Sequence, residues 1–179
     1  MQRSIIKKNI KIGILGGSFN PPHNGHLYIS KFALKKLKLH KLIWAIAKKN
    51  PLKKIKYLSI KKRVKLSKKI LKNEKKISVI FFDKKIKSNN TYDLLKYIKK
   101  KEEKSKLYFI IGADNLVKFH KWYKWKEIPK LSKIVVFPRK KYLDGKKNYI
   151  VSKTLKKSDF IYIDSKKINI SSSLIRKIC

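Results

Sequence analysis

Cysteine, acidic side chains and long apolar runs are all scarce in this chain. A single cysteine, Cys179, excludes an intramolecular disulfide and a thiolate metal cluster, so a reducing compartment is the default expectation. No apolar run is long enough to cross a bilayer, and the apolar segment after the basic N-terminus is short and runs into a glycine-rich turn. That segment predicts a first β-strand and not a signal peptide, and we expect a soluble, cytoplasmic protein with no membrane partner.

The acidic residues number 10 against 50 lysines and arginines, which gives a net charge of +40 at pH 7. One interpretation is a polyanionic partner, because clustered lysines release counterions from nucleic acid. The other is compositional bias, since lysine is spread over nearly every segment and arginine, which takes the specific contacts, is rare. The even spread favours compositional bias, and we expect no specific nucleic-acid partner. The charge still predicts easy capture of anionic substrates and weak, salt-sensitive binding to nucleic acid.

The length of 179 residues suits one domain, 1–179, and the pattern along it is that of an α/β protein. Short apolar runs alternate with amphipathic segments, which predicts repeated βα units around a parallel sheet. The predicted strands cover 10–15, 42–47, 77–82, 107–111, 134–137 and 160–163. The predicted helices cover 25–37, 60–71, 91–100, 115–119 with 126–131, 150–155 and 172–178. Asn90, followed by Asp93, predicts the N-cap of the third helix.

The turn after the first strand carries the most specific signal. It reads GGSFNPPHNGH from Gly16 to His26. Paired glycines allow backbone amides to approach a phosphate, and the positive end of the following helix favours the anion further. His23 and His26 are three residues apart, so both rings can face one side of the first helical turn, and Gly25 leaves room for a nucleotide. A tight loop with helix-capping histidines is the competing interpretation, which the whole string in its strand-turn-helix context outweighs.

This string resembles the GxFxPxHxGH signature of the nucleotidyltransferase superfamily, whose members activate ATP or CTP. Near the C-terminus, ISSSLIR at 170–176 is similar to the superfamily's second signature, usually ISSTxIR. The resemblance implies a Rossmann-like open parallel sheet with helices on both faces. It also implies that hydroxyls and amides at a helix start meet the nucleotide phosphates, while Arg176 offers a forked cation.

The middle of the chain resembles the bacterial nicotinate-nucleotide adenylyltransferases within that superfamily. IGADN at 111–115 with FHKWYKW at 119–125 is similar to their GADN...FHxW segment, NPLK at 50–53 to their NPxK, and NTYD at 90–93 to their YTxDT. Matched positions run from Ile12 to Arg176, nearly the whole chain. The resemblance implies adenylyl transfer from ATP to nicotinate mononucleotide, giving nicotinate adenine dinucleotide and pyrophosphate in NAD biosynthesis. Mg²⁺ would arrive with ATP, so no metal-ligating protein residues are expected.

Site residues follow from the resemblance at the matching positions. Asp114 would hold the adenosine ribose, Trp122 would stack on the pyridine ring, and the amide of Tyr123 with the hydroxyl of Thr91 would meet the nicotinate carboxylate. Trp125 is expected to be a structural aromatic, in the core or packed on the surface. The implied catalytic set is His23, His26 and Arg176; the ATP-binding set is Gly16, Gly17, Ser18, Phe19, Gly25, Gly112, Asp114, Ser172 and Ser173; and the nicotinate mononucleotide-binding set is Lys53, Thr91, Trp122 and Tyr123.

The implied reaction is a direct displacement at the α-phosphorus of ATP. The phosphate nucleophile is already ionised near neutral pH, so alignment and charge stabilisation suffice without a general base. His23 and His26 would stabilise the α-phosphate, and we expect nearby phosphates to keep them protonated. Lys53, Ser173 and Arg176 would stabilise the departing phosphates or the acceptor.

Some positions depart from the family pattern, and three rival functions stay open. Asn20, Pro22 and Ser173 stand where Asp, Val or Ile, and Thr are usual, and Leu94 replaces a second Thr. The first rival, phosphopantetheine adenylyltransferase, carries both signatures but usually has Thr where His23 stands, and it lacks the GADN...W segment. The second is an enzyme that prefers the amide form of the mononucleotide, and the third is a basic nucleic-acid-binding module on the same fold. The sequence leaves open whether the protein is a monomer or a homodimer.

Overall fold

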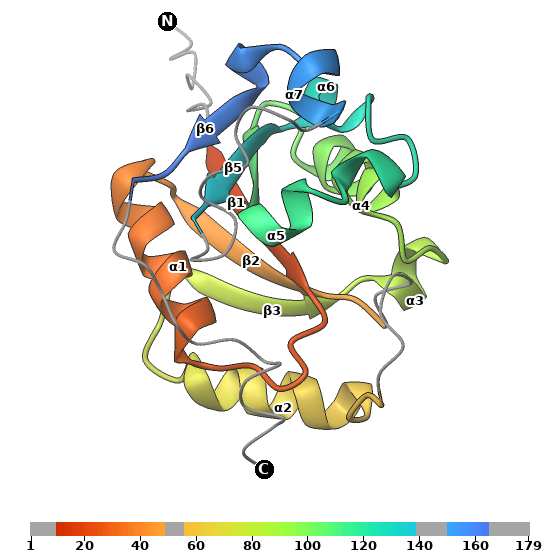
Figure 1. Ribbon diagram of the computed structural model, residues 1–179. Coiled ribbons are helices and arrows are strands. Elements are labelled where there is room, and N and C mark those ends of the chain that lie inside the picture. Colours follow the sequence, from red (N-terminus) through yellow and green to blue (C-terminus); the bar gives the residue numbers. More distant parts are fainter. Residues whose placement is uncertain (1–9, 49–55, 139–149, 165–179) are drawn as a thin grey trace, which may run out of the picture.

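A six-stranded sheet forms the centre of the protein. The computed structural model describes residues 10–48, 56–138 and 150–164 (Figure 1). The strand order is β3-β2-β1-β4-β5-β6, and each neighbouring pair is parallel. The strands are β1 Lys11–Gly17, β2 Lys41–Ile46, β3 Ile77–Phe81, β4 Lys106–Gly112, β5 Lys133–Phe137 and β6 Phe160–Tyr162. The strand order therefore reverses between β1 and β4, the point at which an open parallel sheet forms its ligand crevice.

Helices of very different length connect the strands. They are α1 Asn24–Lys36, α2 Ile60–Ile70, α3 Asp83–Ile86, α4 Thr91–Lys101, α5 Ala113–Leu116, α6 Ile128–Leu131 and α7 Ile150–Thr154, with 3-10 turns η1 Phe119–Lys121 and η4 Lys157–Asp159. A side chain caps α2, because Ser59 Oγ accepts a hydrogen bond from the amide of Lys62 and so satisfies a donor that the first turn leaves over. Among the described residues, no helix combines the length and hydrophobicity that a membrane crossing requires.

The core lies on both faces of the sheet. On one face, Ile12 and Ile14 of β1 belong to a buried cluster with residues of α4, α5, α6 and α7. On the other face, Leu15 and Trp44 belong to a cluster that includes Ala33 of α1 and Leu71 at the end of α2. Strands buried on both faces explain the uninterrupted apolar runs in the sequence. The prediction of a parallel sheet with helices on both faces is confirmed (Figure 1).

The predicted strands are all present, with ends that shift by one or two residues, whereas some helices differ. The predicted segments 115–119 and 126–131 are partly confirmed: α5 overlaps the first, η1 follows it, and α6 lies inside the second. Lys124, whose φ of 48° is left-handed, lies in the gap between these segments, where a right-handed helix cannot continue. The four residues of α3 were not predicted, because so short a helix has no periodic pattern. The predicted helix at 172–178 lies outside the described residues.

Asn90 occupies the predicted N-cap of α4, but a different side chain is the closer partner of Asp93. The Asn90 side chain makes no capping hydrogen bond to the helix, and its Nδ2 reaches Asp93 Oδ2 only at 3.5 Å. Ser88 Oγ donates to the same carboxylate oxygen at 2.6 Å and accepts from the amide of Asn90 at 3.2 Å. The segment before α4 is thus fixed by a serine that the capping pattern did not include.

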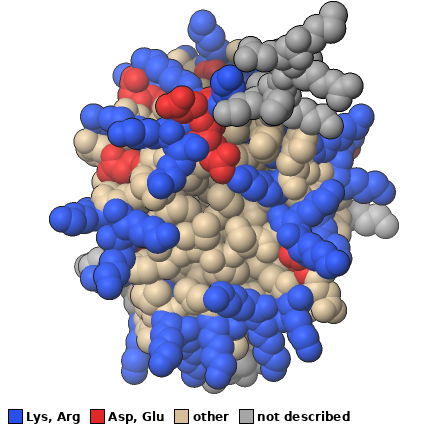
Figure 2. All heavy atoms as spheres, turned by 180° about the vertical axis from the view of Figure 1, so that it is seen from behind, with Lys and Arg blue, Asp and Glu red and all other residues tan. Residues whose placement is uncertain are grey.

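Lysines dominate the surface. Figure 2 shows Lys and Arg side chains around the rim of one face, with few Asp and Glu side chains among them. Among the described residues, ion pairs join Lys31 to Glu74, Lys41 to Glu102 and Lys130 to Glu127. A surface with so few carboxylates attracts anions from all sides.

Candidate active site

The turn after β1 brings its two histidines into contact at the start of α1. His23 is the N-cap residue, and its Nδ1 accepts from the amide of Gly25 at 3.1 Å. His26 reaches back, and its Nδ1 accepts from the amide of His23 at 3.2 Å. The ring centroids lie 3.8 Å apart. The histidines therefore do cap the helix, and the same bonds hold their two rings together at its positive end.

These hydrogen bonds also determine which ring nitrogen carries the proton. An Nδ1 that accepts a hydrogen bond carries no proton, so Nε2 carries the proton of each neutral ring. In His23 and His26, Nδ1 accepts from a backbone amide. The arrangement favours neutral Nε2–H donors over the protonated rings expected from the sequence. A neutral donor can still stabilise a phosphate oxygen on which charge builds up.

The two glycines of this turn leave space for aromatic side chains. A Cβ placed on Gly16 would lie 3.0 Å from the Phe109 ring, and one on Gly17 would lie 3.3 Å from the Phe19 ring. Phe19 is 1% exposed and stacks on Trp44 with a centroid distance of 4.9 Å. Because the Phe19 side chain is enclosed in the core, the predicted contact of this residue with ATP can involve only its backbone.

The turn after β4 lies beside the turn after β1. The two strands pair in parallel, with Leu15 opposite Ile110, so their carboxyl ends meet at the same edge of the sheet. β4 ends at Gly112, the N-cap residue of α5, and Asp114 lies in the first turn of that helix and is half-buried. The predicted ribose-binding aspartate and the predicted phosphate-binding histidines thus stand on neighbouring strand ends, at the point where the strand order reverses.

Three of the predicted acceptor residues, Thr91, Trp122 and Tyr123, lie close to one another. Trp122 is half-buried, and its ring lies 6.0 Å from that of Phe109, the ring that also contacts Gly16. Tyr123 is 50% exposed and lies edge-on to Tyr92, 6.2 Å between centroids, directly after Thr91. The Thr91 segment and the Trp122 segment are therefore neighbours, and the Phe109 ring contacts both Trp122 and Gly16 of the phosphate turn.

Trp125 packs against Phe119 with centroids 6.3 Å apart and lies against the buried cluster on that face of the sheet. Its side chain is half-buried, which agrees with the prediction of a structural aromatic in the core or packed on the surface.

Lys124 adds a cation beside the predicted acceptor residues. Its Nζ lies 5.2 Å from the ring centroid of Tyr92 and 5.3 Å from that of Tyr123. A hydrogen bond with the Tyr123 side chain raises the pKa of Lys124 above its ordinary value, so the ammonium is charged at neutral pH. The sequence analysis did not single out this lysine, because one more lysine carries no signal in such a chain.

Arg63 and Asn20 are the other functional candidates that the sequence did not reveal. Arg63 on α2 is 1% exposed, and its guanidinium donates to the carbonyls of Ser18, Ala47, Lys48 and Leu58. Burial lowers the pKa of this guanidinium below its ordinary value. Asn20, also 1% exposed, bonds to the backbone of Lys56 and Leu58. The one available signal was an arginine within a helix whose other basic residues are lysines.

Several predicted site residues cannot be placed. Those outside the described residues are Lys53, Ser172, Ser173 and Arg176. Within the described ranges, no three His, Cys, Asp or Glu side chains form a group that could hold a metal ion.

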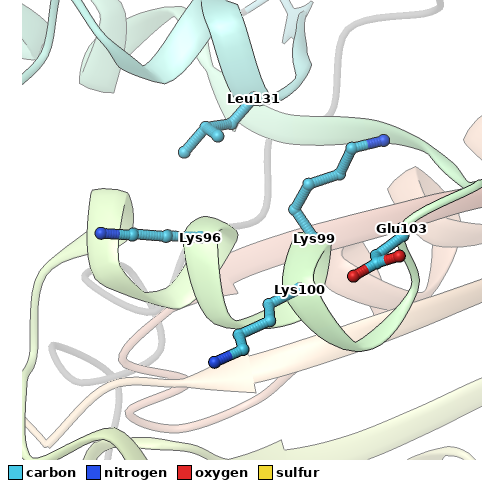
Figure 3. A pocket seen from close by; sticks show the side chains of 5 residues that line it. All are labelled: Lys96, Lys99, Lys100, Glu103 and Leu131. Carbon is cyan, nitrogen blue, oxygen red and sulfur yellow. The ribbon is translucent and has the colours of Figure 1, made fainter.

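A shallow hollow elsewhere on the surface contains none of the predicted residues. It lies between α4 and α6 and is lined by Lys96, Lys99, Lys100, Glu103 and Leu131. Figure 3 shows Leu131 of α6 pointing toward α4, from which the lysines extend. The three lysines belong to the carboxyl-terminal half of α4, whereas Thr91 begins the helix at its other end.

Comparison with known proteins gives one consistent family. The Cytidylyltransferase-like family model matches residues 14–178. A protein of Pelagibacter ubique named probable nicotinate-nucleotide adenylyltransferase is 46% identical over 99% of this chain and 98% of its own length. One of the same name from Agrobacterium fabrum is 37% identical over 72% of this chain and 68% of its own. The solved structure of Plasmodium falciparum nicotinic acid mononucleotide adenylyltransferase complexed with NaAD has the same fold, with a TM-score of 0.75 and 22% identity over 94% of this chain and 83% of that one. The chain is therefore a member of the cytidylyltransferase-like family and, within it, belongs with the nicotinate-nucleotide adenylyltransferases.

Proposed function

We infer that this protein transfers the adenylyl group of ATP to nicotinate mononucleotide, with release of pyrophosphate, as a step of NAD biosynthesis. The observation that carries the inference is the meeting of two turns where the strand order reverses: the turn with His23 and His26 after β1, and the turn with Asp114 after β4. The name and the end-to-end likeness of the Pelagibacter relative support the same reaction.

The chemical step is an in-line displacement. A phosphate oxygen of the mononucleotide forms a bond to the α-phosphorus of ATP while the bond from that phosphorus to the β-phosphate bridging oxygen breaks. The nucleophile is already ionised, so no side chain has to remove a proton. The Nε2–H groups of His23 and His26, oriented through their Nδ1 bonds, donate to the α-phosphate oxygens as charge builds up on them.

The nucleotide has its own set of proposed contacts. The backbone of Gly16, Gly17 and Ser18 and the start of α1 would meet the phosphates, and Asp114 would accept from the ribose hydroxyls. Lys53, Ser173 and Arg176 remain proposals for the departing phosphates. Magnesium that arrives with ATP would neutralise charge on the phosphate oxygens.

The acceptor would lie against the cluster of Thr91, Trp122 and Tyr123. Trp122 is backed by Phe109 and Phe119, so a rigid aromatic face is available to a pyridine ring. The Tyr123 amide and the Thr91 hydroxyl would donate to the nicotinate carboxylate. Lys124, the cation beside Tyr123, would favour the carboxylate over the neutral amide through longer-range attraction.

A pyrophosphate-release assay with ATP and magnesium tests the proposal. Nicotinate mononucleotide, nicotinamide mononucleotide and phosphopantetheine are offered in parallel, and we expect turnover with the first to exceed the others. Turnover with phosphopantetheine alone would establish the rival transferase. No turnover with any acceptor, combined with DNA binding that persists at high salt, would instead establish the nucleic-acid-binding module.

A further inference from the structure

Arg63 makes an unusual set of contacts for a side chain on an outer helix. Its guanidinium is buried, and its bonds reach carbonyl oxygens at 3.0 Å (Leu58), 2.6 Å (Ser18), 2.8 Å (Ala47) and 2.8 Å (Lys48). All four acceptors are backbone oxygens. A planar fork with five donors can serve several carbonyls at once, which the single nitrogen of a lysine cannot do.

The groups that Arg63 binds belong to the ends of two neighbouring strands. Ser18 follows β1 and opens the turn that contains the histidines, whereas Ala47 and Lys48 follow β2. The amide of Lys48 in turn donates to Asp83 Oδ2 at 2.7 Å, directly after β3. Arg63 therefore links the β1 and β2 strand ends, and Lys48 extends that link to β3.

Asn20 completes the connection from the histidine turn. Its Nδ2 donates to the carbonyl of Lys56 at 3.0 Å, and its Oδ1 accepts from the amide of Leu58 at 2.9 Å. The segment that leads from β2 to α2 is thus tied to the histidine turn at both of its described ends, by Arg63 at 47–48 and by Asn20 at 56–58. Lys53, the predicted phosphate contact, lies between these ends in the sequence.

We propose that Arg63 is a positioning residue of the transfer reaction, which with Asn20 fixes the distance between the histidine turn and the segment after β2. The inference rests on the proposed function, because it assigns the two segments to one pair of substrates. Neither side chain needs to touch a substrate: Arg63 acts through Ser18 and Lys48, and Asn20 through Leu58. A misplacement of one segment by about 1 Å would lower the rate by up to about 100-fold.

Two variants and a matched control test this role. Arg63→Lys keeps the charge but loses the fork, and Asn20→Ala releases 56–58 without exposing a buried charge. Leu71→Ala is the control, because Leu71 lies in the core at the far end of the same helix, 7% exposed, and its backbone hydrogen bonds go to Ser67 and Glu74. Hydrogen exchange of 16–20, 46–48 and 56–58 is measured together with kcat and KM for ATP and the mononucleotide, well below each variant's Tm.

For Arg63→Lys we expect faster hydrogen exchange in the histidine turn and in 46–48 together. For Asn20→Ala we expect faster hydrogen exchange at 56–58. In both variants kcat should be lower by about 10- to 100-fold. Leu71→Ala should lose thermal stability but keep the exchange of these segments and kcat within about twofold. Unchanged exchange, faster exchange with normal kcat, or an equal kcat loss in Leu71→Ala would overturn the proposal. If the wild type transfers to no acceptor, the proposed function fails, and the exchange of the two segments still decides whether Arg63 sets their spacing.

Discussion

Replacing His26 by alanine separates its chemical role from its structural one. His26 Nδ1 accepts from the amide of His23, and the two rings are in contact. His26→Ala therefore removes half of a capping box as well as the proposed Nε2–H donor. Loss of a cap costs about 1 kcal/mol, which for a protein of this size lowers Tm by about 2–4 °C.

The effect on turnover should be far larger than the effect on stability. Loss of one donor that stabilises developing charge costs about 10²–10³ in kcat, or about 2.7–4 kcal/mol. We therefore expect kcat for pyrophosphate release to fall by that factor, with KM for ATP changed much less, while the folded state persists. The assay is steady-state pyrophosphate release with ATP and nicotinate mononucleotide, accompanied by a thermal melt of the same sample.

His40→Ala provides the matched control. His40 Nδ1 also accepts a backbone hydrogen bond, from the amide of Lys11 at 3.0 Å, but it precedes β2 at the amino end of the sheet. Its loss should lower Tm slightly and leave kcat unchanged. If His26→Ala kept kcat within about threefold of the wild type, or raised only KM, the donor role at the α-phosphate would be refuted.

Three further changes probe the acceptor site and the segments behind it. Trp122→Phe should raise KM for nicotinate mononucleotide roughly fivefold, since about 1 kcal/mol of aromatic contact is lost, and leave KM for ATP unchanged; an equal rise in both constants would remove Trp122 from the acceptor site. Lys124→Gln should lower the preference for nicotinate over nicotinamide mononucleotide by about two- to fivefold at low salt and by less at high salt. The Nζ of Lys126 lies over Trp125, so the control Lys126→Gln should keep the preference of the wild type. Equal preferences in both variants would contradict the role of Lys124. Burial raises the pKa of Asp83, so this carboxyl contributes stability at low pH that is lost as pH rises through the window between its unfolded and folded pKa values. Asp83→Asn keeps an oxygen for the Lys48 amide and should flatten that part of the pH dependence of the unfolding free energy. An unchanged slope would show that Asp83 does not cause it.

The sequence predicted the strands and the first turn because their signals are local. β-branched runs mark strands buried on both faces, and the string from Gly16 to His26 specifies a turn by itself. The placement of the turns after β1 and β4 at one edge of the sheet followed from the general rule that parallel strands end at the same edge. The identity of the acceptor followed from resemblance, not from periodicity or spacing.

The contacts of Arg63 and Asn20 could not be predicted in the same way. Both side chains bind backbone atoms, and a carbonyl oxygen belongs to any residue, so the partners leave no trace in the sequence. Asn20 looked like a mild departure from the family pattern, yet it both donates and accepts, which an ionised aspartate cannot do.

The position of the triphosphate tests the account most directly. A crystal structure with magnesium and a non-hydrolysable ATP analogue should place an α-phosphate oxygen about 2.7–3.2 Å from Nε2 of His23 or His26, with the ribose beside Asp114. A nucleotide bound anywhere else, such as the lysine-lined hollow between α4 and α6, with the histidine turn empty, would contradict it.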